Sequence, residues 1–91
     1  MLKRVHILIS GDVQGIGFRF STIQVARDLK LTGWVRNNPE STVEIIAEGE
    51  EESLENLIAW AKEGPKPAKV ANVKIDWQKP TGDFDSFDVR Y

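Results

Sequence analysis

The apolar residues of this chain change between strand spacing and helix spacing along the sequence, and the order of these changes limits the folds open to it. Val5, Ile7 and Ile9 fall on one face of an extended segment, which predicts a first strand over residues 3–10. Further strands are predicted around Trp34 and Val35 and over residues 43–48, 70–78 and 87–91. The NNPE stretch at residues 37–40 predicts a hairpin turn, because asparagine tolerates positive φ and proline presets φ.

Two helices are predicted between these strands. Residues 18–30 carry apolar residues at helical spacing, and Lys30 is expected in the last turn, where a cation meets the negative end of the helix dipole. The second helix is the more strongly amphipathic one. Its apolar stripe follows i, i+3, i+4 and i+7 spacing and consists of Leu54, Leu57, Ile58 and Ala61. Gly64 and Pro65 are expected to end it, since glycine accepts the left-handed cap and proline cannot continue a helix.

This order of elements predicts a ferredoxin-like fold. Two helices with one apolar face each can both cover a sheet only by lying on the same side of it. The order strand, helix, strand, strand, helix, strand is that of the split βαβ sandwich, so we expect an α+β protein, βαββαβ, with an antiparallel sheet and both helices on one face. With 91 residues the chain is expected to form a single domain, residues 1–91.

The composition excludes several classes of site and partner. The chain has no cysteine and only one histidine, His6, so disulfides, thiolate zinc sites, cysteine nucleophiles and multi-histidine metal sites are ruled out. A formal charge of -2 argues against nucleic acid as a partner. No stretch resembles a signal peptide or a membrane span. We therefore expect a cytoplasmic monomer with no nucleic-acid or membrane partner.

The stretch GDVQGIGFR, residues 11–19, follows the first predicted strand directly. It lacks the third glycine of the dinucleotide-binding motif and the Gly-Lys-Ser/Thr ending of the Walker motif. The glycines still allow successive backbone N–H groups to turn inward as an anion nest, at the positive end of the following helix, with Arg19 beside it. The alternative is a tight strand-to-helix turn with a solvated Arg19. From this stretch alone the two interpretations are equally supported.

The same stretch resembles the signature of the acylphosphatase family. GDVQGIGFR is similar to its pattern Gly-x-Val-Gln-Gly-(Val or Ile)-x-(Phe or Tyr)-Arg, and GWVRN followed by TVE resembles its second block. The likeness extends over the whole chain in length and element order. It implies the ferredoxin-like fold and hydrolysis of the carboxyl-phosphate bond of small acyl phosphates, to a carboxylate and inorganic phosphate, with no metal or cofactor.

The resemblance also implies roles for particular residues. Arg19 would hold the phosphoryl group and Asn37 would orient the attacking water. The substrate phosphate would be bound by Arg19 and by the backbone N–H groups of Gln14, Gly15, Ile16, Gly17 and Phe18. The chain departs from the family at Asp12, where a basic residue is common, and at Ser41, where glycine is often found. Asp12 is expected to weaken the field for an anion, and Ser41 to affect the turn.

Alternatives to this assignment follow from the residues themselves. Beside Asn38 and Pro39, Asn37 is by its own chemistry a turn residue, and Asn38 competes for the same role. Asn37 would face the glycine-rich loop if the first two strands were neighbours in the sheet. A non-catalytic anion-binding module is the second functional hypothesis, since the fold hosts many functions. An RNA-recognition module is disfavoured because the strand TVEIIAEG has no aromatic residue and is acidic.

Overall fold

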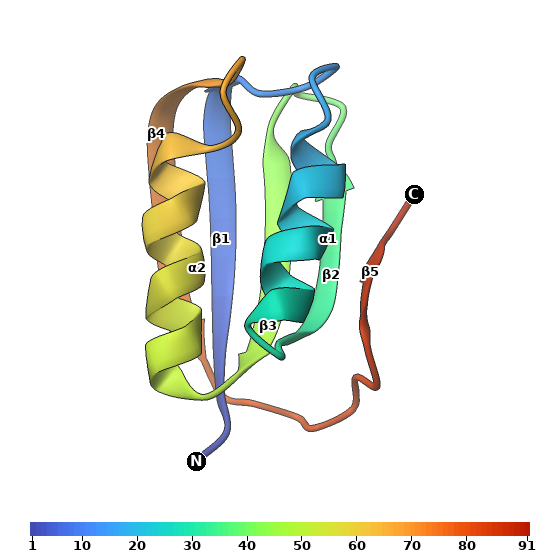
Figure 1. The fold of residues 1–91 in the computed structure, drawn as a ribbon, viewed down its shortest axis with the longest axis vertical. Helices are drawn as coiled ribbons and strands as arrows, with labels where there is room; N and C mark the ends of the chain where they lie inside the picture. Colours follow the sequence, from blue (N-terminus) through green and yellow to red (C-terminus); the bar gives the residue numbers. More distant parts are fainter.

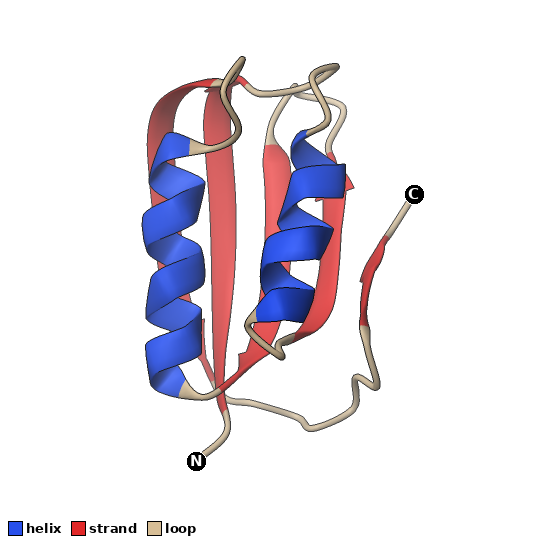
Figure 2. Cartoon of the chain, in the orientation of Figure 1, coloured by secondary structure: helices blue, strands red, loops and turns tan.

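Two helices lie side by side on one face of a five-stranded sheet (Figure 1; Figure 2). The computed structural model describes residues 1–91. Its elements are, in order, β1 (Lys3–Asp12), α1 (Phe18–Asp28), β2 (Thr32–Asn37), β3 (Val43–Gly49), α2 (Glu51–Glu63), β4 (Lys69–Gln78) and β5 (Phe87–Val89). The predicted α+β ferredoxin-like fold is confirmed.

The strand order across the sheet is β4-β1-β3-β2-β5. Pairing among β1 to β4 is antiparallel, as expected, whereas β5 pairs parallel to β2 with Gly33 opposite Phe87. Figure 1 shows the link after β4 running past the end of the sheet that lies near the N-terminus before it reaches this far edge. The premise that the first two strands are neighbours is wrong, because β3 lies between β1 and β2.

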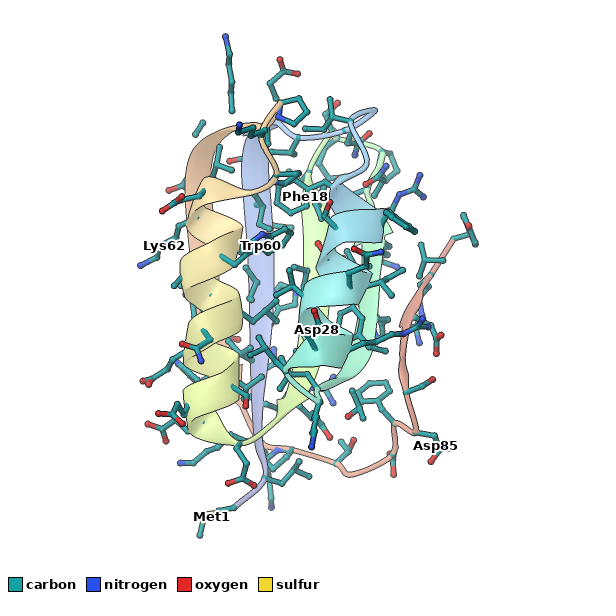
Figure 3. The ribbon with its side chains drawn as sticks, in the orientation of Figure 1. Met1, Phe18, Asp28, Trp60, Lys62 and Asp85 are labelled. Carbon is teal, nitrogen blue, oxygen red and sulfur yellow. The ribbon has the colours of Figure 1, made fainter.

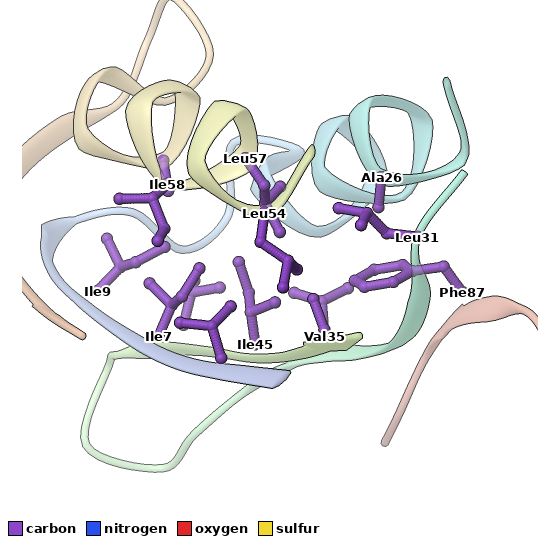
Figure 4. Close-up of a cluster of buried hydrophobic side chains, with 14 of the residues drawn as sticks. Ile7, Ile9, Ala26, Leu31, Val35, Ile45, Leu54, Leu57, Ile58 and Phe87 are labelled. Carbon is purple, nitrogen blue, oxygen red and sulfur yellow. The ribbon is translucent and has the colours of Figure 1, made fainter. Parts of the chain in front are cut away.

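The core fills the space between the sheet and the helices. Ile7, Ile45 and Val35 rise from the sheet toward Leu54 and Leu57 of α2 (Figure 4). The second predicted helix stripe is buried in full: Leu54, Leu57, Ile58 and Ala61. Burying one such aliphatic side chain contributes about 1.5–3 kcal/mol, so this cluster supplies the main driving force that the chain has in place of disulfides.

Two local expectations fail for identifiable reasons. Helix α1 ends at Asp28 rather than near residue 30, and Lys30 takes a left-handed conformation with φ 61° just beyond it. In the β1–β4 pair a register shift between Ser10 and Gly11 interrupts the strict alternation expected over residues 70–78. As a result Val70 and Val73 both pack against the core, although alternation places them on opposite faces.

On the face opposite the helices, Glu48 is almost completely buried, with 1% of its surface exposed. Its carboxylate accepts hydrogen bonds from the backbone N–H groups of Thr81 (2.9 Å) and Gly82 (3.0 Å) and from Arg4 Nη1 (3.2 Å). Burial alone would raise the pKa of Glu48, but these hydrogen bonds hold it below its ordinary value. Glu48 thus fastens the link between β4 and β5 to the sheet.

Candidate active site

The loop between β1 and α1 is held at both ends by buried apolar side chains. Val13 and Phe18 are buried, and Phe18 packs edge-on against Trp60 of α2 with ring centroids 5.3 Å apart (Figure 3). Between them Gly15 and Gly17 have φ values of 77° and 80°. A Cβ atom at either glycine would meet nothing within 4 Å. Glycine is therefore required here for its backbone conformation and not for space.

The backbone N–H groups from Gln14 to Phe20 donate no hydrogen bond within the protein. The first amide after them that does so is that of Ser21, which donates to the Gly17 carbonyl at 3.0 Å. This run includes the N-terminal amides of α1, which carry the positive end of the helix dipole. The first turn of α1 contains no acidic residue that could cap them. The segment therefore offers a series of free donors suited to a small anion.

Arg19 lies in the first turn of α1, half-buried, on the wall of a cavity of about 200 Å³. It forms no ion pair with any carboxylate, in contrast to Arg4, Arg27 and Arg36. Its guanidinium carbon lies 5.7 Å from the centre of the Tyr91 ring. A cation at the positive end of a helix is unfavourable without a counter-ion, so this position favours binding of an anion.

Asn37 lines the same cavity as Arg19. It is the last residue of β2, not part of the turn, and its Oδ1 atom is buried without a hydrogen-bond partner. The hairpin reaches the loop although β1 and β2 are not neighbours, because the Gln14 side chain ties the two together. Its Nε2 donates to the carbonyls of Asn38 and Thr42, each at 2.9 Å.

Asn38, the competing asparagine, is committed to the hairpin turn. Its Nδ2 donates to Thr42 Oγ1 at 3.0 Å, and its backbone N–H donates to the Thr42 carbonyl at 2.9 Å. Ser41 in the same turn has φ 70°, which explains why glycine suits this position. The turn therefore uses Asn38 and leaves the side chain of Asn37 free to act at the cavity.

The structure brings together four of the residues selected from the sequence. The lining of the cavity includes Gly17, Phe18, Arg19 and Asn37, whereas Gln14, Gly15 and Ile16 lie outside it. Sequence reasoning missed the rest of the wall, which comes from the start of the loop, from α1 and from the C-terminal segment: Val13, Phe20, Ile23, Val89 and Tyr91. Nothing local in the sequence points to Val89 and Tyr91, since only the parallel pairing of β5 with β2 brings them here.

These features are those of a ferredoxin-like protein with a candidate site for a small anion at the start of its first helix. The structure contains no group of three or more His, Cys, Asp or Glu side chains that could hold a metal ion. No helix has both the length and the apolar character needed to cross a membrane. A family model described as Acylphosphatase matches residues 5–89, and the chain belongs to the acylphosphatase family.

Individual relatives match this chain over nearly its whole length. An acylphosphatase of Pelotomaculum thermopropionicum is 43% identical in an alignment that covers 97% of this chain and 96% of the relative. The structure of an acylphosphatase from Coxiella burnetii matches with a TM-score of 0.92 at 40% identity, over 98% of this chain and 93% of that one. The acylphosphatase from Bacillus subtilis matches with a TM-score of 0.94 at 34% identity, over the full length of both.

Proposed function

We propose that this protein is an acylphosphatase in which Arg19 and the loop amides bind the phosphoryl group and Asn37 orients the attacking water. Family membership supports the activity, which is hydrolysis of the carboxyl-phosphate bond of an acyl phosphate to a carboxylate and inorganic phosphate. The residue roles are supported by the cavity that Arg19 and Asn37 share.

The phosphoryl group of such a substrate carries negative charge on oxygens that N–H donors can stabilise. In the proposed site these donors are the unpaired amides of residues 14–18 and the guanidinium of Arg19. Because they are held in place before the substrate arrives, they can stabilise the charge of the transition state with little reorganisation. The leaving group is a carboxylate, which departs without a general acid, so positioning and electrostatics account for most of the catalysis.

Asn37 is proposed to hold the water through its side-chain amide. Its buried Oδ1 can accept a hydrogen bond from that water and aim the water oxygen at phosphorus for in-line attack. An amide is too weak a base to remove the proton, so the proton passes to a phosphate oxygen of the substrate or to solvent. The observation that carries the proposal is this pairing on one cavity: an arginine with no carboxylate partner and an asparagine oxygen with no hydrogen-bond donor.

The test is hydrolysis of benzoyl phosphate, with a metal chelator present, by wild type, Arg19→Ala and Asn37→Ala. We expect sustained wild-type turnover and a loss of 100-fold or more in kcat for each variant. Asn37→Ala should still bind inorganic phosphate, whereas Arg19→Ala should bind it weakly. Arg36→Ala is the matched control, because Arg36 pairs with Glu44 on the opposite face of the sheet.

Near wild-type turnover by Arg19→Ala would remove the assigned role of the arginine. Phosphate binding by the wild type without turnover of any acyl phosphate would instead support the non-catalytic anion-binding module. Both outcomes are separable from misfolding by circular dichroism of each variant.

We further infer that residues 1–91 act as one domain and as a monomer, with a small acyl phosphate as substrate and inorganic phosphate as product. The proposed mechanism draws on Arg19, Asn37 and the loop amides and names no residue of a second subunit. Its steps use only groups of the chain itself. The cytoplasm is the proposed location, and neither nucleic acid nor a membrane is proposed as a partner.

A further inference from the structure

The cavity with Arg19 and Asn37 has an apolar wall that the proposed phosphoryl chemistry does not use. Six of its nine lining residues are hydrophobic. Beyond the buried Val13 and Phe18, this wall consists of Phe20, Ile23, Val89 and Tyr91. Small-ligand sites commonly combine such a wall with a few polar groups that fix orientation.

Part of this wall lies on α1 beside the face that the core buries. The buried residues of the helix are Phe18, Thr22 and Ala26. Phe20 and Ile23 are three residues apart and therefore neighbours on the helix surface. Ile23 also packs against the core, whereas Phe20 does not. Phe20 is 66% exposed, although exposing an aromatic ring to water is unfavourable. The core therefore does not explain why an aromatic residue follows Arg19 directly.

The remainder of the wall is supplied by the C-terminal segment. Val89 pairs with Val35 in the parallel β2–β5 contact, which brings the end of the chain beside the start of α1. Tyr91 is 98% exposed, and the centre of its ring lies 5.7 Å from the guanidinium carbon of Arg19. Few large hydrophobic residues are exposed in this protein, and two of them, Phe20 and Tyr91, border this one cavity.

We propose that Phe20, Ile23, Val89 and Tyr91 bind the acyl group of the substrate and make the protein selective for aromatic over acetyl phosphates. This inference rests on the proposed function, because it requires the phosphoryl group to lie against Arg19. With that end of the substrate fixed, the acyl group lies along the remaining apolar wall of the cavity. A volume of about 200 Å³ suits a small acyl group such as benzoyl and is below the roughly 300–1,000 Å³ of sites for drug-sized ligands.

Binding of two non-hydrolysable phosphonates tests the wall separately from turnover. Acetylphosphonate and benzoylphosphonate carry the two acyl groups on a phosphorus-carbon bond that the site cannot hydrolyse. By calorimetry we expect benzoylphosphonate to bind the wild type about five- to tenfold more tightly than acetylphosphonate. Phe20→Ala should bring this ratio close to one while leaving the affinity for acetylphosphonate unchanged. Phe20→Leu, which keeps an apolar side chain, should retain most of the preference for benzoylphosphonate.

Trp77→Ala is the matched control, since Trp77 is also an exposed aromatic residue but lies on β4 away from the cavity. It should leave the ratio unchanged. A ratio that stays at the wild-type value in Phe20→Ala, or a wild type that binds both phosphonates equally, would overturn the proposal. Circular dichroism verifies that Phe20→Ala is folded, as expected for an exposed side chain.

Kinetics with acetyl phosphate and benzoyl phosphate distinguish the two proposals. In Phe20→Ala we expect a higher KM for benzoyl phosphate with kcat nearly unchanged, because the wall contacts the ground state and the transition state alike. A general defect would instead affect both substrates. If the wild type hydrolyses neither substrate yet discriminates between the phosphonates, the proposed function fails while the apolar wall stands as a binding site.

Discussion

Replacing Asn37 with alanine is expected to stabilise the protein while nearly abolishing turnover. The two effects have one cause, which is that the side chain of Asn37 makes no hydrogen bond within the fold and its Oδ1 is buried. If the side chain served the fold, removing it would lower the stability of the protein. If it serves the reaction instead, removing it relieves the unfavourable burial of Oδ1 and stops the hydrolysis as well.

The magnitude follows from the cost of leaving a buried polar atom without a partner, about 1–3 kcal/mol. Alanine removes that cost but also some packing of a half-buried side chain, so a net gain of about 1 kcal/mol is expected. For a domain of this size 1 kcal/mol raises Tm by about 4–8 °C. Loss of the water-orienting group should lower kcat by about 100-fold, equivalent to about 2.7 kcal/mol in the barrier.

The neighbouring asparagine provides a control of opposite sign. Asn38→Ala loses the hydrogen bond from Nδ2 to Thr42 Oγ1 and should be destabilised by about 1 kcal/mol with little change in kcat. Thermal unfolding and benzoyl phosphate hydrolysis are measured on both variants and on wild type. If Asn37→Ala unfolds several degrees below wild type and still turns over normally, the side chain is structural and the assignment of the water-orienting role is refuted.

Three further predictions concern the loop, the hairpin turn and the face opposite the helices. Gly17→Ala should lose roughly 1–2 kcal/mol in urea unfolding and bind phosphate more weakly, because φ 80° strains any residue with a Cβ atom; unchanged binding would contradict the amide nest. Ser41→Gly should gain about 0.5–1 kcal/mol with unchanged turnover, since φ 70° favours glycine; lower stability would show that the turn does not need it. The pKa of Glu48 is below its ordinary value of 4.5, so the stability that its charge contributes is present above that pH and is lost as the pH falls through the folded-state pKa. The excess stability of wild type over Glu48→Gln should accordingly be large at pH 7 and shrink below pH 4.5, and an excess independent of pH would refute this account.

Much of the candidate site was predictable because its parts are local. Residues 11–19 contain the end of a strand, two glycines, the start of a helix and Arg19, and each of these follows from short-range preferences of the backbone. The second helix stripe was predictable for the same reason, since helical spacing alone determines which residues share a face. The role proposed for Asn37 came from the resemblance to a family, because its own chemistry equally suits a turn.

The sequence by itself determined which segments become strands and helices and where a loop of free amides occurs. Only the tertiary structure decided that β3 separates β1 from β2, that Gln14 ties the loop to the hairpin, and that β5 brings Val89 and Tyr91 to the cavity. It also decided that Glu48 is buried under the β4–β5 link. The physical reason is the range of the interactions. Backbone preferences act within a few residues, whereas strand order, side-chain ties and cavity walls depend on contacts between segments far apart in the chain, whose free energy is set by the packing of the whole fold.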